Sequence, residues 1–347
     1  MKAVAAALVL LLAAAPGLAQ QLRIATFNTE LSRDGPGLLL RDIDRGEDPQ
    51  IAAVIDVITA NNADVLLLQG IDWDLENRAV QALRRRLSEA GTDYPHLLSL
   101  QPNAGRPPAQ PLDLDGDGKR GGPGDNHGYG RFRGQGGMAL LSKLPIDVTA
   151  VRDLSDLLWR KLPQAQLPRH PDGSPYPSRD AQQVQRLSDT GHWVVPLMLP
   201  DGTRLHVLGF HATPPVFDGP EDRNGRRNHD EIRLWQLLLN GELGPVPPAP
   251  FVIVGDANLD PDRGAGRRSA IRDLLSDPRL QDPVPESAEA GTATVDWASV
   301  GKMRVSYVLP SAGLRITGSG VDWPHDAQDA AHRASRHRLV WTDITLP

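Results

Sequence analysis

The sequence predicts a single α/β domain, in which strands and helices alternate along the chain. Residues 22–28 alternate between apolar and polar side chains, as a half-buried strand does. Residues 49–60 begin with a proline and carry apolar residues at helical spacing, which predicts an amphipathic helix. Residues 65–68 are all apolar, as expected for a strand buried on both faces. With 347 residues and no internal repeat, the chain is long enough for one large core.

Further strands and helices follow the same patterns up to the C-terminus. Residues 200–203, Pro-Asp-Gly-Thr, join two alternating runs and predict a hairpin, because Asp-Gly favours a tight turn. Two polar segments rich in Gly, Pro and Asp, 101–137 and 162–190, are predicted as long loops. The other predicted helices are residues 76–90, 228–240 and 268–275, and the other predicted strands are residues 138–142, 193–199, 204–211, 251–255, 304–309 and 339–346.

The composition limits the classes of function. The formal net charge of −6 and the aromatic content of 5% argue against a broad nucleic-acid-binding face, which needs basic residues and stacking platforms. A local basic pocket stays compatible with both numbers. The chain has no cysteine, so disulfides and thiol chemistry do not contribute.

Residues 1–19 have the pattern of a secretory signal peptide. Lys2 precedes an apolar run over residues 3–15, and small residues follow up to Ala19. The run is shorter than the roughly 20 residues that span a membrane, and no later segment is apolar and long enough to cross one. We therefore expect a periplasmic or secreted protein, cleaved near Ala19, with one domain over residues 20–347 and no membrane span. A monomer is the expected state.

Two polar motifs late in the chain carry the strongest chemical signal. The apolar run 251–254 is followed by Gly-Asp-Ala-Asn at 255–258, and Ser-Arg-His at 335–337 precedes the last predicted strand. An Asp can abstract or donate a proton, an Asn can orient a nucleophile, and an imidazolium can neutralise phosphoryl oxygens. The two motifs together indicate attack on a phosphate ester. An ordinary turn for the first and a solvated basic segment for the second are the alternatives.

Five segments in their order along the chain resemble the endonuclease/exonuclease/phosphatase family, whose members are similar to DNase I. The resemblance covers nearly the whole mature chain. It implies a four-layer α/β sandwich of two packed mixed sheets with outer helices, and an active site where strand ends meet at one edge. The segments are residues 22–28 (Leu-Arg-Ile-Ala-Thr-Phe-Asn), 63–70 (Ala-Asp-Val-Leu-Leu-Leu-Gln-Gly), 207–211 (Val-Leu-Gly-Phe-His), 255–258, and 304–309 (Arg-Val-Ser-Tyr-Val-Leu) followed by 335–337.

The resemblance also implies a role for each polar residue. The family typically cleaves phosphoester bonds with a divalent metal, Mg²⁺ or Mn²⁺, and Asn28 would contact this metal or the phosphate. His211 would contact the phosphoryl oxygens, Asp256 would activate or orient a water nucleophile, and Asn258 would position it. His337 would stabilise the transition state or transfer a proton. Such a set suits phosphoryl transfer, which depends on positioning and charge neutralisation. A strand-end cap for Asn28 and a core histidine at 211 are the alternatives.

Three acids of the family pattern are replaced in this chain. Gly70 stands where the family has a metal-binding Glu, Ser306 where it has the Asp that orients the late histidine, and Arg336 where it has another Asp. Mg²⁺ binds oxygen ligands, so the loss of anionic ones weakens a site for it. Two replacements are conceivable. Asp72 or Asp74 could reach the metal from a shifted loop, or Arg336 could bind the phosphate bidentately and supply part of the metal's charge.

A second candidate metal site lies in the glycine-rich loop. Asp113, Asp115 and Asp117 with Gly118 match positions one, three, five and six of an EF-hand-like calcium loop. The twelfth position is Gly124 in place of Glu, and an acid follows one residue later. The fluids outside the cytoplasm supply Ca²⁺, which favours this ion in an exported protein. A merely polar loop is the alternative.

The sequence therefore predicts an exported phosphoesterase acting on phosphodiester or phosphomonoester bonds. Its charge and scarce aromatics leave a small molecule or a lipid headgroup as open as nucleic acid for the substrate. The alternative is a non-catalytic binding protein that keeps the fold but has lost the metal site. The retained polar residues favour the enzyme, because a decaying site loses its parts indiscriminately.

Overall fold

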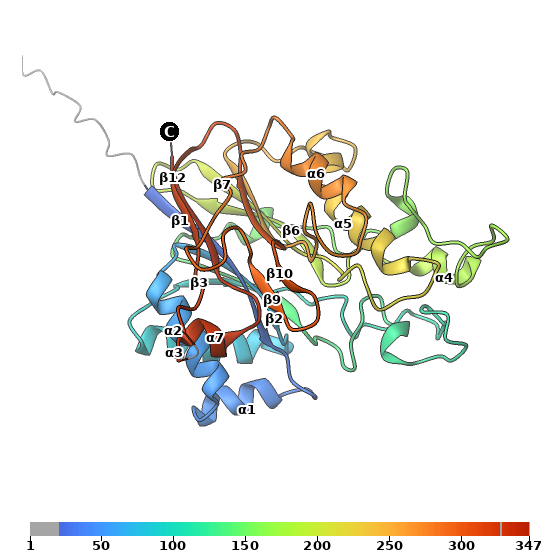
Figure 1. The fold of residues 1–347 in the computed structure, drawn as a ribbon, viewed down its shortest axis with the longest axis horizontal. Helices are drawn as coiled ribbons and strands as arrows, with labels where there is room; N and C mark the ends of the chain where they lie inside the picture. Colours follow the sequence, from blue (N-terminus) through green and yellow to red (C-terminus); the bar gives the residue numbers. More distant parts are fainter. Residues whose placement is uncertain (1–20, 327, 347) are drawn as a thin grey trace, which may run out of the picture.

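The chain folds into two β-sheets that lie face to face, with helices on both outer sides (Figure 1). The structure, a computed structural model, describes residues 21–326 and 328–346. The segment predicted to be a signal peptide lies outside these residues. Within the described part of the chain, no helix is long and apolar enough to cross a membrane.

The first sheet has six strands in the order β12-β13-β1-β2-β4-β3. β1 lies near its centre, antiparallel to β13 and parallel to β2. Along β2, Val65 and Leu67 face the second sheet, whereas Leu66 and Leu68 face the helices. Both faces are thus buried, which explains the continuous apolar run. The strands are β1 (Gln21–Leu31), β2 (Val65–Ile71), β3 (His96–Leu98), β4 (Gly137–Ser142), β12 (Arg315–Val321) and β13 (Val340–Thr345).

The second sheet has five strands in the order β11-β8-β7-β6-β5. β6 and β7 form the predicted hairpin, and β7 is parallel to β8. A separate two-stranded ribbon, β9 with β10, lies beside the strand ends. The strands are β5 (Arg152–Asp153), β6 (Gly191–Met198), β7 (Arg204–His211), β8 (Phe251–Asp256), β9 (Val295–Trp297), β10 (Gly301–Met303) and β11 (Ser306–Pro310).

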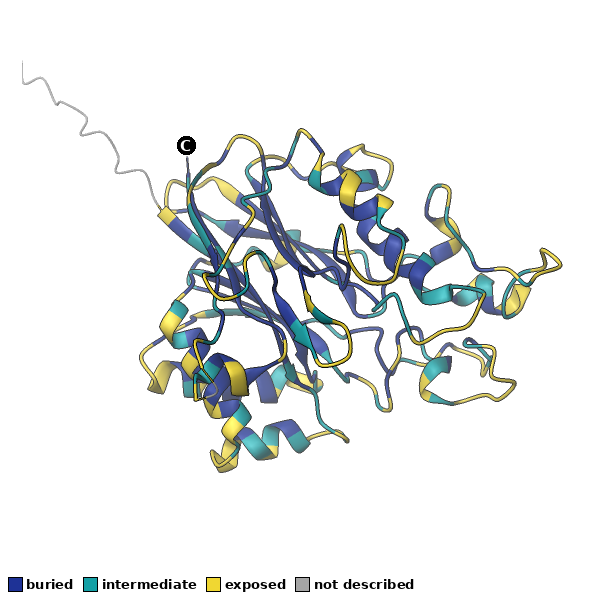
Figure 2. Cartoon of the chain, viewed as in Figure 1, coloured by how far each residue is buried: buried dark blue, intermediate teal, exposed yellow. Residues whose placement is uncertain are grey.

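An apolar core fills the space between the two sheets. Ile24 and Leu67 of the first sheet belong to one buried cluster with Val207 and Val254 of the second. Figure 2 shows the strands buried along most of their length, while exposed residues gather on the outer helices and the loops. Burial on this scale holds the sheets in one fixed orientation, because protein interiors are close-packed.

Helices form the two outer layers. Apolar residues of α1, α2, α3 and α7 pack on the first sheet, and those of α5 and α6 pack on the second. The predicted four-layer α/β sandwich is therefore confirmed. The helices are α1 (Leu38–Arg45), α2 (Pro49–Asn61), α3 (Arg78–Glu89), α4 (Arg179–Val184), α5 (Arg223–Leu239), α6 (Ser269–Leu275) and α7 (Ala330–Ala334).

Several elements differ from the sequence-based expectation. α5 begins at Arg223, five positions before the predicted start at residue 228. The segment 162–190, predicted as a loop, contains α4. The elements α1, α7, β3, β5, β9, β10 and β12 were not predicted, because they are short or carry glycine and polar residues. The segment 101–137 is a loop as predicted, with a short 3₁₀ turn at Pro123–Asp125 and the start of β4 at its end.

β1 and β2 are both irregular at one edge of the sheet. The pairing register shifts between Asn28 and Leu31 in β1 and between Gln69 and Ile71 in β2. Glu30 and Gly70 lie at these shifts with left-handed backbone angles, φ 49° and 66°. Bulges of this kind re-aim a side chain. The irregular edge is the one at which the polar residues gather.

Candidate active site

The polar residues predicted from the sequence meet where strands of both sheets end. Asn28 lies near the end of β1, His211 ends β7, Asp256 ends β8 and Ser306 begins β11. His211 and Ser306 pair with Asp256 from its two sides in the sheet. Directly paired residues point to the same face, so these three side chains are directed together toward Asn28 on the other sheet.

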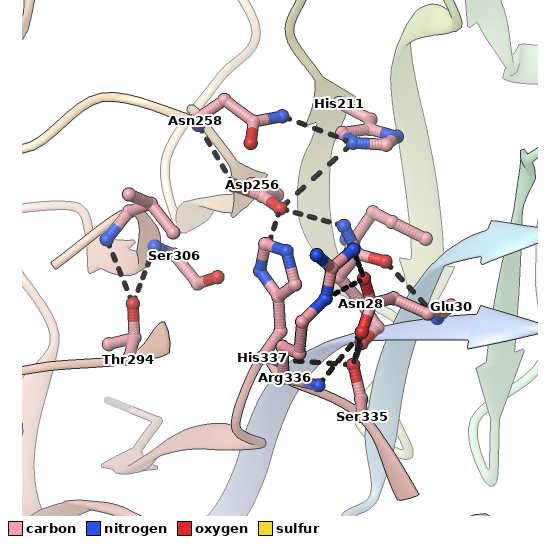
Figure 3. Close-up of polar contacts among 12 residues, drawn as sticks. Asn28, Glu30, His211, Asp256, Asn258, Thr294, Ser306, Ser335, Arg336 and His337 are labelled. Atoms are coloured by element: carbon pink, nitrogen blue, oxygen red, sulfur yellow. Dashed lines mark hydrogen bonds and ion pairs between the residues drawn. The ribbon is translucent and has the colours of Figure 1, made fainter. Parts of the chain in front are cut away.

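Asp256 is the centre of the site and is fully buried. Its Oδ2 accepts a hydrogen bond from Asn28 Nδ2 at 2.9 Å and lies 3.3 Å from His337 Nδ1 and 4.0 Å from His211 Nε2 (Figure 3). Its Oδ1 accepts the backbone N–H of Asn258 at 2.8 Å. A buried carboxylate needs such partners, and here they come from β1, β7, the loop after β8 and the segment before β13.

Asn258 fixes the protonation of His211. Its Nδ2 donates to the carbonyl oxygen of Ala212 at 2.9 Å and lies 3.3 Å from His211 Nε2. Because this nitrogen is a donor, Nε2 of His211 accepts, and the ring proton resides on Nδ1, 3.4 Å from Thr190 Oγ1. Burial lowers the pKa of His211, against the opposing charge of Asp256. His211 is therefore neutral at neutral pH, and the predicted contact with phosphoryl oxygens requires the other tautomer.

His337 is held by backbone and by an aromatic ring. The backbone N–H of His337 donates to Ser335 Oγ at 3.1 Å, and the residue forms a β-bridge with Val295. The ring of Trp297 meets the imidazole edge to face, with centroids 5.6 Å apart. The contact between Nδ1 and Asp256 is short, yet it is not aligned as a hydrogen bond within the described residues. The imidazole thus has its closest charged partner in Asp256, and Trp297 limits its movement.

Ser306 does not take over the role of the acid it replaces. Its Oγ is buried and has no hydrogen-bond partner in the described structure. Thr294 holds the start of β11 instead: its Oγ1 accepts the backbone N–H groups of Val305 at 2.8 Å and Ser306 at 3.1 Å. The serine hydroxyl therefore makes no hydrogen bond that could orient the histidine.

Glu30 is a site residue that the sequence analysis missed. Its Oε2 accepts hydrogen bonds from Ser335 Oγ at 3.0 Å and from the backbone N–H of Arg336 at 2.8 Å. Its Oε1 accepts hydrogen bonds from the Arg336 guanidinium, from Nε at 2.8 Å and from Nη2. Burial opposes the ionisation of Glu30, but the hydrogen bonds from Arg336 outweigh it and lower its pKa. Gln50 Nε2 bonds the carbonyl oxygens of Glu30 at 3.2 Å and Ala334 at 3.1 Å, which ties both segments together. The detectable signal was an acid two positions after Asn28.

The two acids predicted as replacements for the missing glutamate have other partners. Asp72 accepts the backbone N–H groups of Arg33 at 2.8 Å and Gly136 at 2.9 Å, one on each oxygen, and burial raises its pKa. Asp74 accepts the backbone N–H groups of Arg78 at 2.6 Å and Ala79 at 2.7 Å at the start of α3. Both carboxylates therefore stabilise loop and helix backbone. Metal ligation by Asp72 stays a prediction, and this geometry does not favour it.

The oxygen atoms beside Asp256 do not form a suitable set of ligands for a Mg²⁺ or Mn²⁺ ion. Hard divalent ions need several oxygen ligands in near-octahedral order, usually with carboxylates among them. Here the Oδ1 of Asn28 accepts the N–H of Glu30 at 3.3 Å, and the Glu30 carboxylate is bound to Arg336. Within the described residues, the only group of three acidic, histidine or cysteine ligands at mutual binding distance is in another part of the fold.

That group is the loop predicted to bind calcium. Asp113, Asp115 and Asp117 present oxygen atoms within 4.8 Å of one another. Gly124 packs on this cluster, since a Cβ there would lie 1.9 Å from Asp115 Oδ2. Asp125 accepts the backbone N–H groups at positions 114 and 122, both at 2.8 Å, so the late acid stabilises the loop. The clustering of the three aspartates agrees with the prediction, and calcium itself stays a prediction.

The fold and the site together define the class. Two mixed sheets packed face to face, outer helices on both sides and a polar cluster at the strand ends constitute a DNase I-like α/β sandwich. The chain belongs to the endonuclease/exonuclease/phosphatase family, whose family model matches residues 25–337. Members of this family are hydrolases that act on phosphoester bonds and generally depend on a divalent metal.

Solved structures of other proteins share the fold. An endonuclease/exonuclease/phosphatase from Beutenbergia cavernae is 18% identical with a TM-score of 0.58, covering 94% of this chain and 72% of that one. A mannosyl-6-phosphatase from Bacteroides thetaiotaomicron is 15% identical with a TM-score of 0.52, covering 94% and 100%. The human Nocturnin catalytic domain with bound sulfate is 14% identical with a TM-score of 0.52, covering 95% and 96%. No curated protein matches the chain.

Proposed function

We propose that this chain hydrolyses phosphoester bonds, with water as the nucleophile and Asp256 as the group that activates or orients it. The observation that carries the proposal is the position of Asp256 Oδ2. This atom accepts a hydrogen bond from Asn28 Nδ2 at 2.9 Å and lies 3.3 Å from His337 Nδ1 and 4.0 Å from His211 Nε2. A carboxylate between two imidazoles at a strand-end edge can take a proton from water and pass one to a leaving group.

The other site residues support the same chemistry. Asn28 holds the Asp256 carboxylate, and His337 stands where it can give a proton to the leaving oxygen. Asn258 keeps His211 in place through its side-chain amide, beside the predicted role of positioning the nucleophile. The substrate class proposed is a small phosphodiester, a phosphomonoester or a lipid headgroup, and a neighbour described as a mannosyl-6-phosphatase supports the monoester. The leader-like residues 1–19 support export.

The divalent metal predicted from the family is not part of the proposed hydrolysis. Asn28 and Asp72 were the expected ligands of Mg²⁺ or Mn²⁺, but the oxygen atoms beside Asp256 do not form a suitable ligand set for such an ion. For Asp113, Asp115 and Asp117 we propose Ca²⁺, supported by the mutual approach of their oxygens.

A substrate panel tests the proposed activity. Bis(4-nitrophenyl) phosphate and 4-nitrophenyl phosphate would be offered to the wild type, Asp256→Asn and His337→Ala, with EDTA, Mg²⁺, Mn²⁺ or Ca²⁺ present. We expect each substitution to lower kcat by about 10²- to 10⁴-fold, the usual contribution of a general acid or base. The matched control is Asp262→Asn, an acid with 80% of its side chain exposed beyond the same strand end, which should retain full activity.

Two results would contradict the proposal in different ways. Equal turnover in Asp256→Asn and wild type would remove this site from the mechanism. Flat activity across all substrates and metals, with phosphate still bound, would support the non-catalytic binding protein, which the replacement of three family acids favours.

A further inference from the structure

We propose that Arg336, held by Glu30, is the cation that binds the phosphoryl oxygens, and that this site works without a divalent metal. The inference rests on the proposed function, because it names the group that binds the substrate phosphate at the same site. A phosphoester site needs positive charge near the phosphoryl oxygens, and either a metal ion or a guanidinium can supply it.

Glu30 is arranged to hold an arginine. Its backbone lies at the bulge of β1 with φ 49°, and this conformation directs its carboxylate to the segment before β13. There both carboxylate oxygens are engaged, one by Ser335 Oγ and the Arg336 N–H, the other by the guanidinium. A carboxylate whose two oxygens already accept four hydrogen bonds has few lone pairs left to bind a metal ion.

The guanidinium keeps donors free for a ligand. Arg336 uses Nε and Nη2 toward Glu30, and no partner of its Nη1 occurs among the described residues. Its side chain is 65% exposed, whereas that of Glu30 is 23% exposed. The carboxylate thus anchors one edge of the planar fork, and the other edge is open to solvent. A fork held in this manner loses little conformational entropy when it binds a phosphate bidentately.

Arg336 is connected to the reacting groups both along the chain and through Glu30. Arg336 immediately precedes His337 in the chain, and Glu30 lies two residues after Asn28. Hydrogen bonds connect the pair to the site: Arg336 Nε donates to Glu30, the Glu30 backbone N–H donates to Asn28 Oδ1, and Asn28 Nδ2 donates to Asp256 (Figure 3). A phosphoryl group held by Arg336 would therefore lie next to the carboxylate that is proposed to activate water.

No arginine or lysine is present among the residues that contact Asp256 in the described structure. These are Asn28, His211, Asn258 and His337. Burial lowers the pKa of His211, and its Nε2 accepts from Asn258, so it carries no charge at neutral pH. Arg336 is charged at every pH of interest.

Phosphate binding tests the inference separately from turnover. The affinity of inorganic phosphate would be measured by calorimetry for wild type, Arg336→Ala and Arg336→Lys, each in EDTA and in Mg²⁺. We expect wild type to bind equally in both buffers. Arg336→Ala should lose about 10- to 100-fold in affinity, as the loss of bidentate charged hydrogen bonds predicts. Arg336→Lys should lie between them, because it keeps the charge but lacks the fork.

A matched control exists at the opposite end of the second sheet. Arg204, 49% exposed, pairs with Asp147, which is 16% exposed, much as Arg336 pairs with Glu30. Arg204→Ala should leave phosphate affinity and turnover unchanged. Circular dichroism and the melting temperature verify that each variant is folded.

The outcomes separate this inference from the proposed function. Loss of phosphate binding or of turnover in EDTA, with recovery in Mg²⁺ or Mn²⁺, overturns it. Undiminished phosphate affinity in Arg336→Ala, or no detectable phosphate binding by wild type, also overturns it. Metal-free phosphate binding that depends on Arg336 supports it even where no substrate is turned over, and that result would contradict only the proposed hydrolysis.

Discussion

Gly70 leaves room for the side chain of Asn28: a Cβ on Gly70 would lie 2.4 Å from Asn28 Oδ1. Gly70 also has φ 66°, a left-handed conformation that disfavours side chains. The position that the family pattern assigns to a glutamate is therefore shaped here to exclude any side chain.

We predict that Gly70→Ala both destabilises the protein and displaces Asn28. The strained backbone should cost about 1–2 kcal/mol of unfolding free energy, and the collision should add to this. Gly37→Ala is the control for backbone strain alone, because Gly37 has φ 77° and nothing within 4 Å of its Cβ position. Urea unfolding and phosphoesterase assays of the two variants measure the difference. Equal losses in both would show that the contact with Asn28 is unimportant.

The start of β11 offers a second comparison, between two hydroxyls. Ser306 Oγ is buried without a partner, so Ser306→Ala should change the unfolding free energy by less than about 0.5 kcal/mol. Thr294 Oγ1 accepts two backbone N–H groups, so Thr294→Val should cost at least about 2 kcal/mol by leaving buried donors unpaired. Denaturant titration gives both values. A costly Ser306→Ala would mean that its hydroxyl has an important partner.

Buried histidines make the stability depend on acid pH. His192 is fully buried, with Nδ1 at 2.6 Å from Ser188 Oγ and Nε2 at 3.0 Å from the Glu231 carbonyl oxygen. Burial lowers its pKa from 6.5 to about 3. Below pH 6.5 the histidine therefore binds a proton in the unfolded chain but stays neutral in the folded protein. Its contribution to the unfolding free energy falls as the pH falls toward 3. The loss from this residue should be roughly 2 kcal/mol at pH 5.

His192→Gln isolates that effect. Between pH 7 and pH 5 the change in unfolding free energy should be roughly 2 kcal/mol more favourable in the variant than in wild type, whatever the stability of the variant at pH 7. Glu231, whose burial raises its pKa to about 8, contributes the opposite slope in both proteins and cancels in the comparison. Parallel pH profiles of wild type and variant, measured by urea unfolding, would refute a neutral buried His192.

Calcium should stabilise the loop of Asp113, Asp115 and Asp117. We expect millimolar Ca²⁺ to raise the melting temperature by several degrees and to protect the loop from protease, because an ion that binds only the folded state stabilises it. Asp117→Asn should diminish the shift, and Mg²⁺ serves as the control ion, since it demands stricter octahedral geometry. No shift and no protection with Ca²⁺ would remove the site.

Periodicity predicted most of the fold but failed where polar residues are buried. The start of α5 was placed too late because residues 223–227 are all polar or glycine, although Arg227 and the next residue, Asn228, do not face solvent. In the structure both are buried: Arg227 Nε donates to the Leu187 carbonyl oxygen at 2.7 Å, and Asn228 Nδ2 donates to those of Thr213 and Ala257 at 2.7 Å. Such partners are distant in sequence, and no local pattern shows them. β12 was missed for another reason, since its glycines weaken the strand signal.

The sequence by itself determined the family, the layers and the order of the polar residues at the strand ends. Each of these depends on side-chain type and spacing, which are local properties. Only the tertiary structure decided how the site is charged. The bulge of β1 brings the Glu30 carboxylate to the backbone N–H of Arg336, 306 residues later, and Gly70 admits Asn28 by lacking a side chain. These contacts arise from backbone geometry and long-range packing, so the spacing of residues could not reveal them.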